Sequence, residues 1–284
     1  MSASVLFDAP GPKTARRHRL YSLVAAAAIT GVLAWCIWRL HDAGQLAYAK
    51  WEPFVTPDYV RVLLVDGLLE TLKMAVFAIL AAVVFGTALG LAKLSDHAFV
   101  RWPAAAVVEF FRATPVLLLM IFIWYALGIA NDASSFRAVV IALMLYNGAV
   151  LAEVLRAGIN AVPKGQSEAA YAIGMRKTQV MSSILIPQAV KIMFPAIISQ
   201  CIVALKDTAL GFAIAAPGLM AIAKQIYLDP QFNNRVPTMF VVAALYISVN
   251  LLLMALAAWL QKKYVGEKKL VVPMVGAGDT AKAA

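Results

Sequence analysis

The sequence predicts an all-α integral membrane protein with six transmembrane helices. Three observations lead to this fold class. Of the 284 residues, 62% are hydrophobic and only 14% are charged, well below the quarter that is usual in soluble domains. Apolar runs of about 20 residues, the length that crosses a bilayer, recur along the chain. The net charge of +10 is concentrated between these runs and at the chain ends.

Six segments are apolar and long enough to span about 30 Å of hydrocarbon. They are 20–40, 66–94, 103–128, 136–156, 191–216 and 237–260. Because the number is even, both termini share one side of the membrane. Basic stretches precede the first span (KTARRHR) and follow the last (QKKYVGEKK), and such stretches favour the cytoplasm. We therefore expect a multi-pass protein of the cell (inner or plasma) membrane with both termini cytoplasmic.

The chain divides into three parts on this pattern. Residues 1–65 hold a basic tail, an extra transmembrane helix and an outer loop; residues 66–260 form the transmembrane domain; residues 261–284 form a basic tail that we expect to be disordered. The first span could instead be a cleaved signal, because AYA at 47–49 resembles a cleavage site. Its apolar core of about 19 residues exceeds the usual 7–15, which favours a retained anchor.

The sequence lacks the motifs that are typical of several function classes. The chain has no basic, aromatic-rich soluble domain for nucleic acid, and no G-x-x-x-x-G-K-[ST] loop for nucleotide phosphates. It also lacks H-E-x-x-H and Ser-centred elbow motifs, and its three His are scattered. We expect no catalytic residue, no metal and no cofactor in this chain.

The longest polar segment on the cytoplasmic side, 157–190, predicts a short helix. Pro163 suits a first helical turn and Gly174 a C-terminal stop, about ten residues apart. The helix could dock in a cleft of another protein or lie on the bilayer. Interfacial helices normally carry bulky apolar residues. The small Ala169 and Ala170 favour docking.

These residues resemble a known family. The pattern of Glu168-Ala169-Ala170, three residues, Gly174, nine residues and then ILIP ending at Pro187 is similar to the EAA loop of the permease subunits of type I ABC importers. Ile186 stands where that family usually has Leu. The resemblance covers about 66–260, so it implies a five-helix type I permease core preceded by one extra N-terminal helix.

The resemblance also implies partners and a role. The EAA helix would couple to an ATPase subunit through Glu168, Ala169, Ala170, Gly174 and Pro187. Two ABC ATPase subunits would bind ATP and Mg, a second permease chain, identical or related, would complete the pore, and an external binding protein would deliver substrate. EFFRATP (109–115) and ALKDTAL (204–210) resemble the polar amino acid branch, closest to glutamate-type permeases, although Ala113 and Ala209 depart from the expected Gly and Ser.

Charges within the predicted spans are candidates for a translocation path. Charges inside a bilayer are costly and usually face a cavity or partner. Glu109 and Arg112 lie three residues apart and can pair on their own helix, as can Glu153 and Arg156. We expect Arg112, about 14 Å beyond Pro103, to face the protein interior.

An amino acid offers a carboxylate and an ammonium, so a path for it needs a cation, acceptors and hydroxyls. The candidates on two spans are Glu109, Arg112, Thr114, Lys206, Asp207 and Thr208. The competing interpretation is a structural ion network that holds the third and fifth spans together.

A rival function is an ion-coupled secondary transporter or channel whose loop lies on lipid. Many such folds contain inverted repeats, and the two halves of this chain show no convincing similarity. The outer loop 217–237 has two interpretations, a docking surface for a binding protein or a solvated connector.

Overall fold

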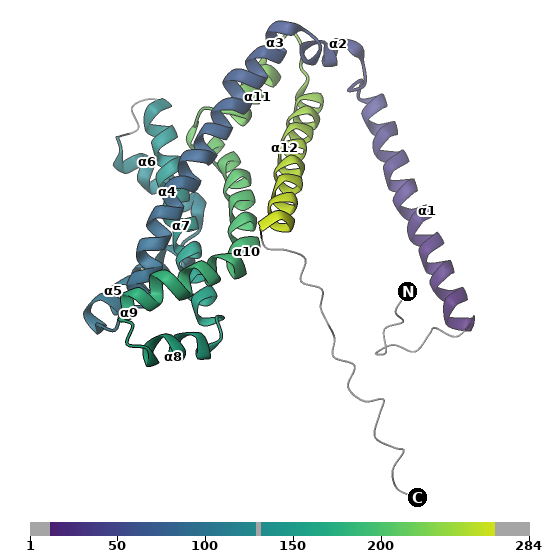
Figure 1. The fold of residues 1–284 in the computed structure, drawn as a ribbon. Helices are drawn as coiled ribbons and strands as arrows, with labels where there is room; N and C mark the ends of the chain where they lie inside the picture. The colour runs from purple at the N-terminus through teal and green to yellow at the C-terminus, as the bar shows by residue number, and fades with distance from the viewer. Residues whose placement is uncertain (1–11, 129–131, 265–284) are drawn as a thin grey trace, which may run out of the picture. The chain divides into compact units, whose positions relative to one another are not determined.

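The computed structural model describes residues 12–128 and 132–264. Throughout these residues the regular secondary structure is helical (Figure 1). The elements in order are α1 (Pro12–Asp42), α2 (Tyr48–Trp51), η1 (Glu52–Phe54), α3 (Pro57–Val62), η2 (Leu63–Leu69), α4 (Glu70–Lys93), α5 (Ala98–Ala113), α6 (Val116–Ala126), α7 (Asp132–Asn160), α8 (Lys164–Ala172), α9 (Lys177–Val180), η3 (Met181–Leu185), α10 (Ile186–Asp207), η4 (Thr208–Ile214), α11 (Leu219–Leu228) and α12 (Arg235–Tyr264).

Five of the six predicted spans are confirmed as helices long and apolar enough to cross a membrane. The third is instead a pair, α5 and α6, bent by 104°. The break lies at Thr114–Pro115, where Thr114 is extended with φ −86° and ψ 129°. A residue that precedes proline is pushed out of the helical region, which explains the break.

Two compact units divide the described chain. One contains the chain up to Val60 together with Gln225–Val241, and the other contains Arg61–Lys224 and the chain from Val242 onward. The boundary therefore differs from the predicted division at residue 65. The predicted tail also begins later, because α12 continues to Tyr264. The rest of that predicted disordered tail lies outside the described residues.

The outer loop 217–237 is not a simple solvated connector. It contains α11 and the fully buried Asn234, whose Nδ2 donates to the carbonyl of Lys50 at 3.1 Å within the first unit. In the same unit, the rings of Tyr59 and Phe232 meet edge to face at 5.5 Å. The segment that contains Lys50 and Tyr59 therefore packs against the segment that contains Phe232 and Asn234.

In the larger unit, α4 and α7 pack closely through glycine. A Cβ added to Gly86 would lie 2.6 Å from the carbonyl oxygen of Gly148, and one added to Gly90 would lie 2.9 Å from the side chain of Leu155. Both distances are too short for real atoms. The small-residue motif GTALG (86–90) therefore serves helix packing, as membrane helices commonly use it.

Several apolar clusters fill this unit, among them a small one around Val108 and Ala152 where α5 meets α7. Another surrounds Met120, Val139 and Ile214, between α4, α6, α7 and η4. A third surrounds Leu155, Ala189 and Met193, where α7 meets the start of α10. Between α7 and α10 a polar bond crosses the bundle, from Gln200 Nε2 to Asn147 Oδ1 at 2.6 Å.

Candidate functional site

Helix α8 forms as the punctuation of the sequence predicts. Pro163 stands at its N-cap, and Gly174 follows its C-cap in the left-handed region at φ +83°. The Gly174 N–H donates to the carbonyl of Tyr171 at 2.9 Å and the Met175 N–H to that of Ala170 at 3.2 Å. These two bonds form a Schellman motif, which satisfies the carbonyls at a helix end and selects glycine.

The exposed surface of α8 includes several small residues. Ala170 is buried, whereas Glu168 and Ala169 are exposed. Two apolar side chains flank this surface: Tyr171 is 48% exposed and Ile173, just beyond the helix, 79% exposed. The loop thus presents the Glu168 carboxylate, the small Ala169 and Ala172 and two larger apolar side chains at one end of the unit, which we call the loop end.

Pro187 stands in the first turn of α10, directly after the π-helical turn η3 (Met181–Leu185). Helix α10 continues directly from α9 and η3, so the predicted loop 157–190 is largely helical. The adjacent Gln188 extends toward α8, with its Nε2 3.5 Å from Gln166 Oε1. Movement of α8 therefore has a short route into a long membrane helix.

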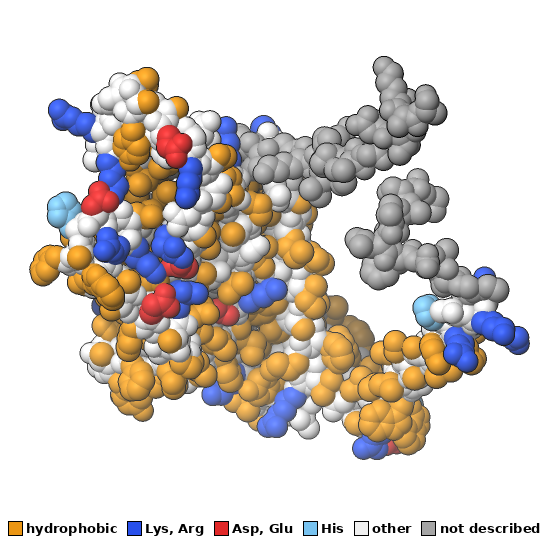
Figure 2. Space-filling view, turned by 90° about the horizontal axis from the view of Figure 1, so that it is seen from below, with side chains coloured by type: hydrophobic (Ala, Val, Ile, Leu, Met, Phe, Trp, Pro, Cys, Tyr) orange, Lys and Arg blue, Asp and Glu red, His pale blue; other side chains and the backbone are white. Residues whose placement is uncertain are grey.

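The four predicted charges at the loop end form one network with a fifth residue. Arg112 Nη1 lies 3.2 Å from Glu109 Oε1, and Arg156 Nε donates to Glu153 Oε1 at 2.7 Å, so both predicted pairs are confirmed. Lys93 joins the two pairs: its Nζ lies 2.6 Å from Glu153 and 3.5 Å from Glu109. Figure 2, which views this end, shows acidic and basic side chains side by side on it.

The network corrects two expectations. Arg112 is not about 14 Å inside a straight span, because Glu109 on the same turn contacts Lys93, the last residue of α4. Its side chain is 38% exposed rather than directed into the protein interior. The network joins α5 to α4 and α7, and within the described residues no ion pair links α5 to α10, so the competing idea of an ion network between the third and fifth spans finds no support there.

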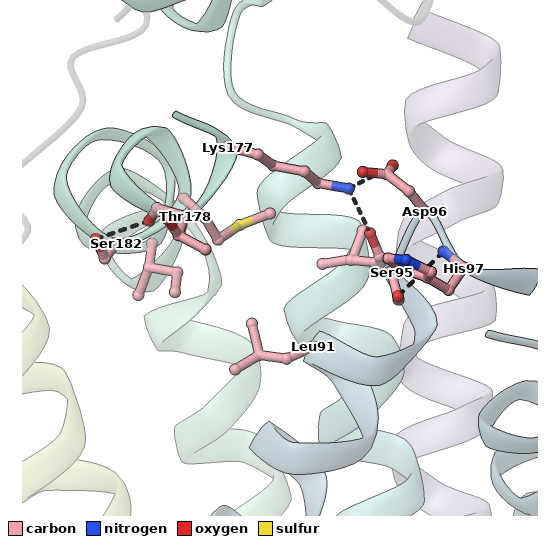
Figure 3. Close-up of a pocket in the computed structure, with 10 residues that line it drawn as sticks. Leu91, Ser95, Asp96, His97, Lys177, Thr178 and Ser182 are labelled. Atoms are coloured by element: carbon pink, nitrogen blue, oxygen red, sulfur yellow. Dashed lines mark hydrogen bonds and ion pairs between the residues drawn. The ribbon is translucent and has the colours of Figure 1, made fainter. Parts of the chain in front are cut away.

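A second polar contact at the loop end ties the turn between α4 and α5 to α9. Lys177 Nζ lies 2.5 Å from Asp96 Oδ1 and donates to the carbonyl of Leu94 at 3.2 Å (Figure 3). The hydrogen bond from Lys177 lowers the pKa of the Asp96 carboxyl below its ordinary value. Asp96 is therefore ionised at neutral pH, and the contact weakens only in acid, as the pH falls through that lowered pKa.

Lys206, Asp207 and Thr208 lie at the other end of α10. Lys206 is exposed and Asp207 half-buried, and within residues 12–128 and 132–264 neither forms an ion pair. Thr208 is buried, and its hydroxyl donates to the carbonyl of Leu205 at 2.6 Å. Lys206 lines a cavity of about 400 Å³ with Tyr246 and Asn250, two α12 residues that sequence analysis missed.

The two groups of candidate path residues are far apart within this chain. Thr208 and Thr71 line one small cavity, whereas Glu109 contacts Lys93. Thr71 and Lys93 lie near opposite ends of the 24-residue helix α4, about 33 Å apart at 1.5 Å per residue. Thr114, which ends α5 with a bond from its hydroxyl to the carbonyl of Phe110, belongs to the group at the loop end. One amino acid cannot bridge this distance.

Apolar spans, a protruding helical loop and polar groups at both ends define a membrane transport subunit. Residues 76–266 match the family described as "Binding-protein-dependent transport system inner membrane component", and the chain belongs to this family.

Individual relatives agree with this assignment. The chain is 44% identical to the "Glutamate transport system permease protein GluD" of Corynebacterium glutamicum over 229 residues, which cover 79% of this chain and 83% of that one. It is 32% identical to the "Glutamate/aspartate import permease protein GltK" of Escherichia coli O6:H1, over 70% of this chain and 92% of that one. A crystal structure of an amino acid ABC transporter with histidines matches with a TM-score of 0.65 and 31% identity, over 71% of this chain and 94% of that one.

Proposed function

We propose that this chain is the permease subunit of an ATP-driven importer of polar amino acids, with acidic amino acids such as glutamate as substrates. The observation that carries the proposal is α8, a capped helix with an open, small-residue surface, in a chain of this family. The substrate class rests on the names of two relatives, GluD and GltK, both of which are glutamate permeases.

Energy would enter through α8. The exposed Glu168, Ala169 and Tyr171 would sit in a cleft of an ATPase subunit, and closure of two such subunits would draw two α8 helices together. ATP and Mg would be bound by those ATPase subunits, and this chain would supply no catalytic residue, metal or cofactor. A second permease chain, identical or related, and an external binding protein would complete the transporter. This arrangement requires α8 and both termini to be cytoplasmic.

Because the candidate path residues form two separate groups, the substrate would meet these groups one after the other. Lys206, Asp207 and Thr208 would meet the substrate at the outer end, and Glu109, Arg112 and Thr114 would meet it about 33 Å further in. Lys206 offers a cation for a substrate carboxylate, and Asp207 an acceptor for its ammonium. The lack of ion pairs for Lys206 and Asp207 in the described chain supports this role.

The complex with its ATPase subunits and binding protein, reconstituted in proteoliposomes, tests the proposal. We expect labelled glutamate to enter only with internal ATP, and unlabelled aspartate to compete better than arginine. Uptake driven by an ion gradient after ATP is exhausted would contradict the proposal and favour the secondary transporter.

Substitutions in α8 test the docking surface. Glu168→Arg reverses an exposed charge, so it should abolish ATPase co-purification and uptake while membrane insertion is kept. Gly174→Asp should do the same by straining a residue at φ +83°. Asp42→Arg, an exposed charge reversal at the end of α1, is the matched control and should leave both unchanged. Normal co-purification with Glu168→Arg would overturn the role of α8.

A further inference from the structure

Lys177 connects the segment that follows α8 to a separate turn, the one between α4 and α5. Lys177 opens α9, three residues after the Gly174 turn that ends the loop helix. Its two acceptors, Asp96 Oδ1 at 2.5 Å and the Leu94 carbonyl at 3.2 Å, belong to a different turn at the loop end, between α4 and α5. We call this pair of contacts the clasp.

The turn that Lys177 holds is itself fixed to α5 and α7. Arg101 Nη1, on α5, donates to the carbonyls of Ser95 at 3.1 Å and Asp96 at 3.3 Å. Lys93, directly before the turn, has only 9% of its side chain exposed and contacts Glu153 of α7. A displacement of the turn is therefore passed to the helix that carries Arg112.

A cavity separates the turn from α9 and η3 beside the clasp. It measures about 450 Å³ and is lined on one side by Leu91 and Leu94 and on the other by Met181 and Ile186. Figure 3 shows Lys177 extending from its helix across to Asp96. Leu94 on the one side and Met181 and Ile186 on the other pack against one apolar core around Leu155 and Met193. Across the open part of the gap, the clasp adds a direct polar contact between the two segments.

We propose that Lys177 is a positioning residue that makes the α4–α5 turn, and with it α5, follow the movement of α8. This inference rests on the proposed function, in which ATPase closure moves α8. The helix α10 would receive the same movement through the continuous α9–η3–α10 segment. The clasp would thus synchronise two helices that carry the two groups of path residues.

The solvent exposure of the clasp makes it possible to distinguish a role in transmitting movement from a role in folding stability. The side chains of Lys177 and Asp96 are 41% and 74% exposed, and exposed ion pairs add little to folding stability. Loss of the clasp should leave assembly and thermal stability intact. The effect should appear in the number of substrate molecules imported per ATP hydrolysed.

The test uses the complete complex in proteoliposomes, with labelled glutamate as the probe and phosphate release as the measure of ATP hydrolysis. We expect Lys177→Gln and Asp96→Asn each to lower uptake per ATP by about threefold to tenfold. The double variant should be no worse than either single variant, because both remove one interaction. Combining Asp96→Lys with Lys177→Asp should restore part of the ratio.

Arg176→Gln is the matched control, since it removes the neighbouring exposed cation, which forms no ion pair in the described part of the chain. Its ratio should equal that of the wild type. Unchanged ratios in the single variants, additive losses in the double variant, or loss of ATPase co-purification would each overturn the role of Lys177. A wild-type complex without ATP-driven uptake would instead remove the proposed function, and this inference with it.

Discussion

The two ends of the larger unit treat their charges in opposite ways. At the loop end, Lys93 and Arg156 both pair with Glu153, and Lys93 also reaches Glu109, so that charges from three helices are paired with one another. At the other end, Lys206 and Asp207 have no ion pair within the described residues. Charge alone therefore does not identify a path residue. The paired charges hold helices together, so Glu109 and Arg112 would meet a substrate only by exchanging these partners, whereas Lys206 and Asp207 are available to a ligand or a partner.

Lys93→Met should produce the largest change in stability. The substitution keeps the length of the side chain but leaves Glu153 with Arg156 alone and removes a contact of Glu109. Because Lys93 is 9% exposed but Glu153 is 22% exposed and keeps Arg156, we expect the free energy of unfolding to fall by about 2 kcal/mol, between the values for exposed and for fully buried pairs. Thermal unfolding in nanodiscs measures this.

Removal of the carboxylate that is left behind provides the control for this change. Adding Glu153→Gln to Lys93→Met should add little to the loss, because both changes remove the same Lys93–Glu153 pair and the charge left without its carboxylate, Arg156, is 40% exposed. A loss below about 1 kcal/mol for Lys93→Met, typical of exposed pairs, would show that the network does not hold these helices together.

Much of the fold and of helix α8 could be predicted from local sequence. Hydropathy located five spans, since a helix that crosses a membrane is a property of one continuous segment. The caps of α8 were equally local: Pro163 and Gly174 specify its ends through their own backbone preferences. Pairs such as Glu153 and Arg156 follow from helical spacing.

The features that the sequence did not predict depend on how separate segments are placed in space. The hydropathy pattern treats 103–128 as one span, although Pro115 forces Thr114 out of the helical region and bends the chain by 104°. The Thr-Pro pair was the available signal. Lys93 with Glu153 and Asn147 with Gln200 are 60 and 53 residues apart in sequence, so no local spacing predicts these contacts.

Lys206→Met should change function and leave stability nearly unchanged. An exposed side chain without an ion pair costs the fold little when it is replaced, within about 0.5 kcal/mol of unfolding free energy. If Lys206 binds the substrate carboxylate, uptake of labelled glutamate should fall by about tenfold or more, as a charged hydrogen bond of about 1.5–3 kcal/mol implies.

Lys191→Met is the matched control, because it removes another exposed lysine from the same helix. Its uptake should be close to that of the wild type. Equal losses for the two variants would attribute the effect to the general charge of α10 and not to a path residue.

Glu109→Gln should have only a small effect on stability, although Glu109 belongs to the same network as Lys93. Its side chain is 62% exposed, and its contacts to Arg112 and Lys93 measure 3.2 and 3.5 Å. Exposed pairs of this kind contribute little, so we expect at most about 0.5 kcal/mol of unfolding free energy, measured by the same thermal unfolding. A double-mutant cycle with Arg112→Gln should give a coupling of similar size. A loss that equals that of Lys93→Met would mean that the network acts as one buried unit, and the distinction between its buried centre and its exposed edge at α5 would fail.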